Sequence, residues 1–421
     1  MRTITLEEHF YTESFLSAVR NRNPDALAPP IVASVLPKLT DLGPGRIAAM
    51  DEAGVDLQVL SLASIGFDSF SAAESIPLAR DINDELAAAI RTHPTRFAGF
   101  ATLPVKDPSM AAKELERCIT QLGFSGVMLN GTTSIAGAPA LSSSSSTSLF
   151  FDDPHFLPIF EAAVHLNVPV YLHPAPPPTA VKQVYYANLP GETGNLLSIA
   201  GWGWHSETAL HTLRLIVSGL FDKFPTLQLI IGHMGEGLPY WLLRSSDMLS
   251  KASSHLRQPV ADYFRTNIHL TTSGFFTQPP LRCAIDVIGM DRLMYSVDYP
   301  FASNAAGRKF LSETQLSKED LARLTHRNAE TLLKLPPAGT ETQASRTSHS
   351  NNASHPTQSL SPSTKSQGES IMRRILFWST LASGAVAAYL MSRRGASITE
   401  IAKNSIGNPV GSLVNELKQV S

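Results

Sequence analysis

Histidine and carboxylate side chains stand where several short apolar runs of the sequence end. The first run closes with Glu7 and His9, a later one with His173, and another with Asp298. Residues two apart on a strand share a face, so Glu7 and His9 are expected to point together and Leu6 the opposite way, toward packed helices. Two imidazoles and two carboxylates form a mixed nitrogen and oxygen ligand set that suits Zn²⁺ or Mn²⁺. The pattern predicts one divalent metal site.

A further pair, His233 and Glu236, follows another apolar run. A single histidine at a strand end is more often structural than catalytic. Polar residues that gather at several strand ends are hard to explain by core packing, and titratable clusters of this kind are typical of functional sites. The position of His233 therefore makes it a further candidate member of this group of polar residues.

The elements that must position these residues are repeated Val-, Ile- and Leu-rich runs separated by helix-compatible stretches. Strands buried on both faces and alternating with helices indicate parallel β/α architecture. Eight such units predict a closed (β/α)₈ TIM-type barrel, in which catalytic groups lie at the carboxyl ends of the strands. The expected strands are Thr3–His9, Val55–Leu62, Phe97–Leu103, Gly126–Asn130, Val168–His173, Leu227–His233, Ile268–Thr272 and Leu293–Asp298.

Composition excludes several function classes. The formal net charge is −2, with 34 Lys and Arg against 36 Asp and Glu, so no basic excess points to nucleic acid. Two cysteines, Cys118 and Cys283, are too few for a disulfide framework. The amino terminus has no apolar run of signal-peptide length. These features predict a cytosolic enzyme domain.

The sequence changes character after residue 335. Residues 336–370 are rich in Ser and Thr with almost no large apolar side chains, which is typical of a disordered linker. Residues 371–421 form a tail in which 375–391 is uncharged and flanked by paired arginines. That stretch is at the lower limit for a membrane-spanning helix. It could equally be a partner-packed helix, or Met372 could begin an annexed reading frame. The barrel is expected to occupy residues 1–335.

Several motifs resemble the amidohydrolase-related decarboxylases, a group that includes the γ-resorcylate, 2,3-dihydroxybenzoate, 6-methylsalicylate and aminocarboxymuconate-semialdehyde enzymes. The resemblance covers essentially residues 1–335, and Glu7-x-His9 is similar to the benzoate-type enzymes rather than to the semialdehyde enzyme, which has His-x-His. The motifs are LEEHF at 6–10, YLHP at 171–174, GLFDKFP at 219–225, GHMGEGLP at 232–239 and SVDYPF at 296–301.

The resemblance implies a metal-dependent, non-oxidative decarboxylase of ortho-hydroxylated aromatic acids, in the manner of salicylate, 6-methylsalicylate or dihydroxybenzoate enzymes of secondary metabolism. It implies that Glu7, His9, His173 and Asp298 bind Zn²⁺ or Mn²⁺, and that Asp298 also gives a proton to the ring carbon. It further implies that His233 and Glu236 form a polar pair beside the metal, which we expect to orient the substrate or relay protons.

Substrate contacts are expected from three further residues. The resemblance makes Arg244 the residue that binds the substrate carboxylate, and Phe10 and Phe301 are candidates to wall the aromatic ring. By resemblance we also expect a homo-oligomer, a dimer or tetramer. The alternatives are a metal-dependent hydrolase of a small lactone or amide on the same barrel, or a tethering protein whose tail at 375–391 contacts a membrane.

Overall fold

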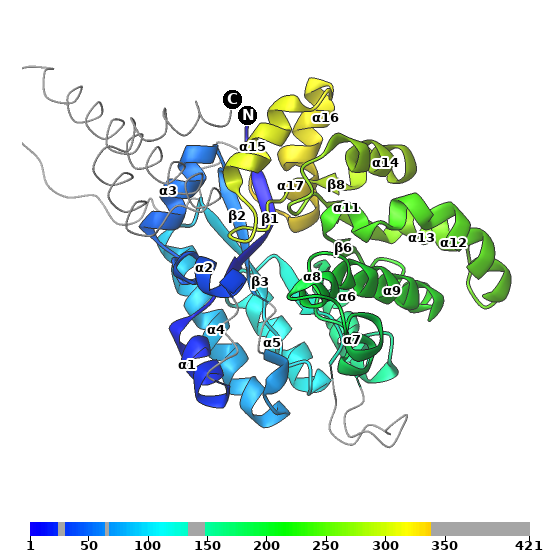
Figure 1. Cartoon of the computed structure of the whole chain (residues 1–421). Coiled ribbons are helices and arrows are strands. Elements are labelled where there is room, and N and C mark those ends of the chain that lie inside the picture. The colour runs from blue at the N-terminus through cyan, green and yellow to red at the C-terminus, as the bar shows by residue number, and fades with distance from the viewer. Residues whose placement is uncertain (24–29, 64–66, 134–147, 338–421) are drawn as a thin grey trace, which may run out of the picture. The chain divides into compact units, whose positions relative to one another are not determined.

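Eight parallel strands form a single sheet in the order β1 to β8, so each strand pairs with its neighbours in sequence. In the computed structural model, which describes residues 1–23, 30–63, 67–133 and 148–337, the strands form the centre of the barrel (Figure 1). The predicted (β/α)₈ barrel is confirmed. The strands are β1 Ile4–Phe10, β2 Leu57–Leu62, β3 Phe97–Ala101, β4 Gly126–Asn130, β5 Val170–His173, β6 Leu229–Ile231, β7 Ile268–Thr271 and β8 Leu293–Met294.

The residues that follow β8 bring the sheet back to β1. Tyr299 forms a parallel bridge with Glu8, and the His9 amide donates to the Tyr299 carbonyl at 2.7 Å. The Ser296 hydroxyl accepts a hydrogen bond of 2.7 Å from the Glu7 amide. These bonds hold the segment after β8 against the strand that carries Glu7 and His9.

Helices surround the strands (Figure 1). The longest, α4, begins with a capping box in which Ser71 accepts from the Glu74 amide and the Glu74 carboxylate accepts from the Ser71 amide. The helices are α1 Glu13–Arg22, α2 Pro30–Leu39, α3 Pro44–Ala53, α4 Ala72–Thr92, α5 Pro108–Thr120, α6 Leu157–His165, α7 Thr179–Tyr185, α8 Thr193–Ser198, α9 Gly203–Val217, α10 Leu220–Lys223, α11 His233–Glu236, α12 Leu238–Ala252, α13 Val260–Asn267, α14 Gln278–Ile288, α15 Asn304–Glu313, α16 Lys318–Ala322 and α17 Asn328–Leu333.

Two apolar cores hold the barrel together. A large outer core fills the space between strands and helices, and it includes Phe10, Phe160 and Leu215. A smaller core fills the barrel interior, where Leu57 and Tyr171 pack with residues of α17. Strands with one face in each core are apolar on both faces, which explains why they appear in the sequence as near-continuous apolar runs.

Six of the predicted strands are shorter than expected, and β6 and β8 are shortened most. The run around residue 230 forms strand only over Leu229–Ile231, and His233 begins α11 instead. Strand β8 covers two residues, so Asp298 lies in the irregular segment beyond it. Backbone at strand ends is where sequence patterns place boundaries least reliably.

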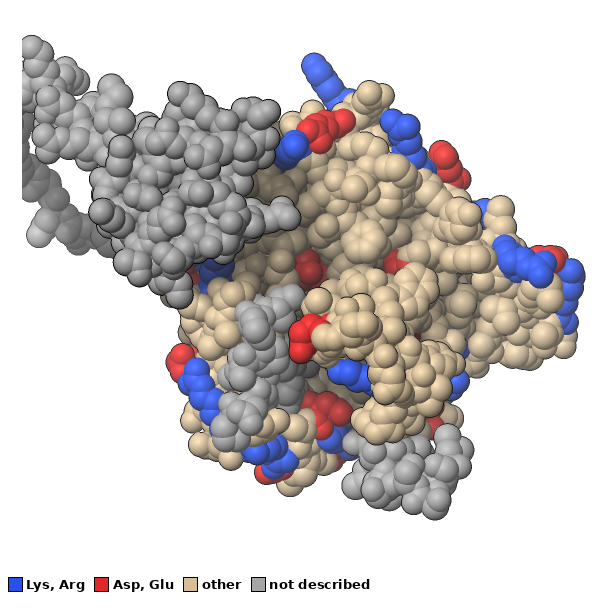
Figure 2. Space-filling model, in the orientation of Figure 1, with Lys and Arg blue, Asp and Glu red and all other residues tan. Residues whose placement is uncertain are grey.

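The predicted linker and the 375–391 segment lie outside the described residues. Within the ranges that the structure describes, no helix is long and apolar enough to span a bilayer. On the face drawn in Figure 2, the described Lys and Arg side chains are interspersed with Asp and Glu.

Candidate functional site

A β-bulge in β1 aims Glu7 and His9 into the barrel. The register with β2 shifts within residues 5–8, so β1 carries one extra residue there. Ile4 and Leu6 pack in the interior core, and the prediction that Leu6 faces the helices is wrong. Because a bulge inserts a residue without a partner, it lets Leu6 and Glu7 both face inward, which strict alternation forbids. The carboxylate of Glu7 therefore enters the barrel above its own apolar neighbour.

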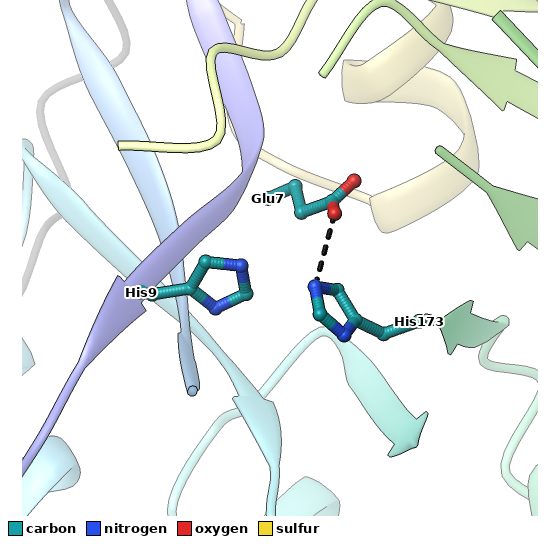
Figure 3. A group of neighbouring side chains, drawn as sticks. All are labelled: Glu7, His9 and His173. Carbon is teal, nitrogen blue, oxygen red and sulfur yellow. Dashed lines mark ion pairs between the residues drawn. The ribbon is translucent and has the colours of Figure 1, made fainter. Parts of the chain in front are cut away.

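The four predicted ligands come together at the carboxyl ends of β1 and β5 and in the segment after β8. Glu7 Oε1 lies 3.1 Å from His173 Nε2, and His9 Nε2 lies 3.2 Å from Asp298 Oδ1. Figure 3 shows Glu7 and His9 of β1 facing His173 of β5, and the two imidazole rings are 4.8 Å apart. Glu7, His9 and His173 are buried, whereas the Asp298 side chain is 21% exposed. Asp298 is thus the one candidate ligand within reach of solvent.

The two oxygens of the Glu7 carboxylate differ. Oε2 accepts hydrogen bonds from the hydroxyl groups of Tyr171 and Ser273. Oε1 accepts none from the described residues, although it is buried. Burial alone would raise the pKa of Glu7, but the charge of the neighbouring His233 holds this pKa well below its ordinary value. Glu7 is therefore an ionised carboxylate with one oxygen free to bind a cation.

The tautomer of His173 supports the same conclusion. Its Nδ1 is 2.8 Å from the Pro174 carbonyl, which can only accept, so Nδ1 carries a hydrogen. When this imidazole is neutral, Nε2 presents a lone pair to Glu7 Oε1, which also carries lone pairs. The two atoms therefore repel each other unless a cation lies between them. Backbone carbonyls commonly fix metal-binding histidines in this way. Glu7, His9, His173 and Asp298 are therefore a donor set that fits Zn²⁺ or Mn²⁺.

A second polar group lies beside this cluster. His233 follows β6 in a turn where His233, Met234 and Glu236 have φ of 50°, 55° and 56°, a conformation that side chains rarely adopt. His233 Nδ1 is 2.8 Å from Glu236 Oε1. Its Nε2 is 3.8 Å from Glu7 Oε1 and 3.9 Å from Asp298 Oδ2. Burial lowers the pKa of His233, but the Glu236 and Glu7 carboxylates outweigh burial and raise this pKa well above its ordinary value.

Sequence reasoning missed His205 as a member of this group. It is the third residue of α9, and its Nδ1 lies 2.5 Å from Glu236 Oε2. The His205 and His233 rings meet edge to face at 4.8 Å, so Glu236 joins two histidines. No strand end marks His205, and only its place beside the conspicuous Trp204 set it apart in the sequence.

The three predicted substrate contacts fall in different places. Phe301 is half-buried and meets the His9 ring edge to face at 5.7 Å, so it lies beside the cluster. Phe10 is fully buried in the outer core, where a substrate ring could not contact it. The prediction that Phe10 walls the substrate ring is therefore wrong. Arg244 is exposed on α12, and no hydrogen bond or ion pair joins it to the residues that the structure describes.

A cavity of about 420 Å³ lies over the carboxyl ends of β2 to β5. Apolar side chains such as Leu103 and Met128 line it together with Lys106 and Asn130, and none of the four candidate ligands does. Asn130 is the register partner of His173 in the β4–β5 pair. The cavity therefore adjoins the cluster, and it has ample volume for a substituted benzene ring.

Comparison with known proteins places this geometry in a family. A family model described as amidohydrolase matches residues 34–335. A decarboxylase of Emericella nidulans, orsB, is 37% identical over 79% of this chain and 97% of its own length. A γ-resorcylate decarboxylase of Polaromonas sp. is 38% identical over 79% of this chain and 98% of its own length.

Solved structures give the same result. A dihydroxybenzoic acid decarboxylase of Polaromonas sp., determined with bound manganese and the inhibitor 2-nitroresorcinol, superposes with a TM-score of 0.69 at 36% identity. The match covers 79% of this chain and 97% of that one. A 2,6-dihydroxybenzoate decarboxylase in complex with 2,6-dihydroxybenzoate has a TM-score of 0.71 at 34% identity, covering 80% and 99%. Because the family model spans most of the barrel and the relatives are matched almost end to end, this chain belongs to the amidohydrolase family.

Proposed function

We propose that this chain is a metal-dependent, non-oxidative decarboxylase of aromatic acids that carry a hydroxyl group ortho to the carboxylate. The observation that carries the proposal is the buried cluster of Glu7, His9 and His173 beside Asp298, in which one carboxylate oxygen accepts no hydrogen bond from the described residues. Relatives named as decarboxylases, matched over nearly their full length, support it.

Glu7, His9, His173 and Asp298 would hold the divalent cation, either Mn²⁺ or Zn²⁺. When bound, the cation supplies acidity to the phenol and a template for the substrate oxygens. Tyr171 and Ser273 hold Glu7 by its other oxygen, which keeps Oε1 aimed at the metal position.

The reaction needs a proton at a defined carbon. Direct loss of CO₂ would leave an in-plane aryl anion that the ring cannot delocalise. Protonating the ring carbon that bears the carboxylate avoids this anion, and an ionised ortho hydroxyl supplies the electron density for it. Asp298 delivers this proton, CO₂ leaves, and the electron pair of the broken carbon–carbon bond restores aromaticity. Each turnover consumes one proton, which Asp298 regains through its solvent-exposed side.

The other polar residues position the substrate and the proton. His233, held by Glu236 and indirectly by His205, faces Asp298 Oδ2 at 3.9 Å. Its raised pKa favours the imidazolium form, which stabilises negative charge on Asp298 after proton delivery. Phe301, which meets the His9 ring edge to face at 5.7 Å, would form one wall beside the substrate ring.

Oligomerisation would explain the exposed part of α12. Monomeric proteins rarely expose several neighbouring large apolar side chains to solvent. This helix exposes four of them, namely Tyr240, Trp241, Leu243 and Met248. A second copy of the chain packed there would also give exposed Arg244 a place at an interface. The role of Arg244 as the carboxylate-binding residue stays a prediction.

A panel of 2-hydroxybenzoic acids tests the proposal directly. The Mn²⁺-loaded protein is incubated with 2,6-dihydroxybenzoate, 2,3-dihydroxybenzoate and 6-methylsalicylate, and CO₂ and the phenol product are quantified. We expect equimolar release from at least one acid, loss of activity with a chelator and loss in His173→Ala. The matched variant His165→Ala, at an exposed position of α6, should keep activity. Absence of CO₂ from every acid, or release that survives metal removal, would overturn the proposal.

A further inference from the structure

The first strand carries two adjacent glutamates, and the proposed chemistry uses only Glu7. Glu8 is fully buried, and no Lys, Arg or His of the described chain forms an ion pair with it. A buried carboxylate without a charged partner is costly unless hydrogen bonds compensate it. The groups that donate hydrogen bonds to Glu8 therefore indicate its role.

Glu8 accepts hydrogen bonds from backbone on both sides of Asp298. The Val297 amide donates to Oε1 at 2.9 Å, and the Tyr299 amide donates to Oε2 at 3.0 Å. The Ser296 hydroxyl donates to Oε1 at 3.1 Å. One carboxylate thus spans the residue whose side chain faces His9, with one oxygen on each flanking amide.

Other bonds also hold this segment: the Thr272 hydroxyl donates to the Ser296 carbonyl at 2.6 Å, and the His9 amide donates to the Tyr299 carbonyl at 2.7 Å. The Glu8 carboxylate adds bonds on both sides of Asp298. Regular pairing of β8 ends at Met294, four residues before Asp298. Asp298 has a φ of 70°, the left-handed region that non-glycine residues adopt only when their surroundings impose it. Amides fixed on both sides of such a residue supply that constraint.

A buried cation completes the arrangement. Arg46 is fully buried, donates to the His9 carbonyl at 2.6 Å and lies over the Tyr299 ring at 5.0 Å. Burial raises the pKa of Glu8 to about 8, and Arg46 forms no direct ion pair with it. The contacts of Arg46 instead join the strand that carries His9 to the segment that carries Asp298.

We infer that Glu8 is a positioning residue that fixes the backbone around Asp298, so that the Asp298 carboxylate stays aimed at His9 and the metal position. The inference rests on the proposed function only for the chemical role of Asp298. A misplacement of a reacting group by about 1 Å can reduce a rate by about 100-fold.

The test is Glu8→Gln. An amide side chain keeps one acceptor oxygen, so either the Val297 or the Tyr299 amide faces an NH₂ group instead. We expect kcat to fall by about 100-fold with KM little changed. Affinity for Mn²⁺, measured by calorimetric titration with the metal alone, should fall about 10- to 100-fold.

Glu114→Gln is the matched control. Glu114 is also a buried carboxylate, bonded to Asn83 at 2.8 Å and to Arg117 at 2.7 Å, but it lies on α5. It should lose thermal stability without losing kcat or Mn²⁺ affinity. If Glu8→Gln loses stability in the same way but keeps kcat and Mn²⁺ affinity, Glu8 is structural only and the inference is wrong.

Two further measurements keep the test decisive. If Glu8→Gln does not fold, Glu8→Asp replaces it in the test, because aspartate keeps both acceptor oxygens on a side chain one methylene shorter. A fall in Mn²⁺ affinity larger than that of Glu114→Gln would support the inference. A fall equal to that of Glu114→Gln would overturn it. If the wild type releases no CO₂, the proposed function fails by itself. The Mn²⁺ titrations, and the His9 Nε2 to Asp298 Oδ1 distance in crystals of the variant, still decide whether Glu8 positions Asp298.

Discussion

Replacement of Gly232 by alanine tests how tightly Glu7 is held. A Cβ at Gly232 would lie 2.5 Å from Glu7 Oε2 and 3.3 Å from the Tyr171 hydroxyl. Ordinary contact begins near 3.4 Å, so Glu7 or the backbone after β6 must move by roughly 0.9 Å. The backbone at Gly232 is extended, with a φ of −77°, so the effect is steric and not conformational.

The magnitude has two parts. Overpacking at a buried position costs about 1–3 kcal/mol of folding stability. Displacement of Glu7 relative to its hydroxyl partners should reduce metal affinity about 10- to 100-fold, which corresponds to about 1.4–2.7 kcal/mol. The assay is thermal unfolding of the metal-free protein together with calorimetric titration of Mn²⁺.

Gly126→Ala separates the two parts. There a Cβ would lie 2.7 Å from the Pro169 carbonyl oxygen and 3.1 Å from the Phe100 ring, at the opposite end of the barrel wall. It should lose comparable stability and keep wild-type Mn²⁺ affinity. If Gly232→Ala and Gly126→Ala bind Mn²⁺ equally well, Glu7 does not depend on its surroundings and the reasoning is refuted.

Three other predictions concern Asp298 as the proton donor, the His205 partner of Glu236, and the pH dependence of folding stability. Asp298→Asn should lower the rate of CO₂ release by about 100- to 10,000-fold, because an amide cannot deliver the proton, and a variant with near-normal release would exclude Asp298 as the acid. His205→Phe should lower kcat, because Glu236 Oε2 loses its hydrogen-bond partner. His205→Asn can still donate a hydrogen bond to Glu236 and should recover part of the lost kcat. Equal kcat values for the two variants would argue against hydrogen bonding as the cause. Burial, with a smaller effect of Arg214, lowers the pKa of His211 to about 3, and its Nε2 accepts from the Phe151 amide. The unfolded chain therefore binds a proton before the folded one as pH falls below about 6.5, and at pH 5 this single group should cost about 2 kcal/mol relative to pH 7. Urea unfolding of His211→Gln at both pH values should show a correspondingly smaller loss, and an unchanged loss would mean that His211 is not the group responsible.

The strand pattern predicted the barrel because strands with two apolar faces leave a strong signal in the sequence. Four candidate ligands were predictable for a related reason. Polar side chains are conspicuous at the ends of such strands, and parallel strands bring their carboxyl ends to one face. His233 was singled out by the same reasoning, although it begins α11 instead of ending β6.

Side-chain direction was less predictable, because it depends on backbone irregularities that composition does not encode. The bulge in β1 turns Leu6 inward together with Glu7, contrary to simple alternation. Phe10 lies one residue after His9, beyond the bulge, so ordinary alternation places it on the opposite face, against the helices. Aromatic residue type alone could not distinguish Phe10 from Phe301.

Contacts between residues far apart in sequence left no local signal. His205 reaches Glu236 from α9, and Glu8 reaches the amides around Asp298 from across the β8–β1 junction. Both contacts join residues far apart in sequence. Only the packing of the whole barrel brings these residues together.

The central claim is that Glu7, His9, His173 and Asp298 hold one divalent ion. Diffraction from Mn²⁺-soaked crystals, measured at the manganese absorption edge, tests this claim most directly. We predict a single strong anomalous peak within about 2.0–2.3 Å of His9 Nε2, His173 Nε2 and Glu7 Oε1, next to the Asp298 carboxylate. A peak bound elsewhere on the barrel, or no peak at full Mn²⁺ loading, would contradict the account.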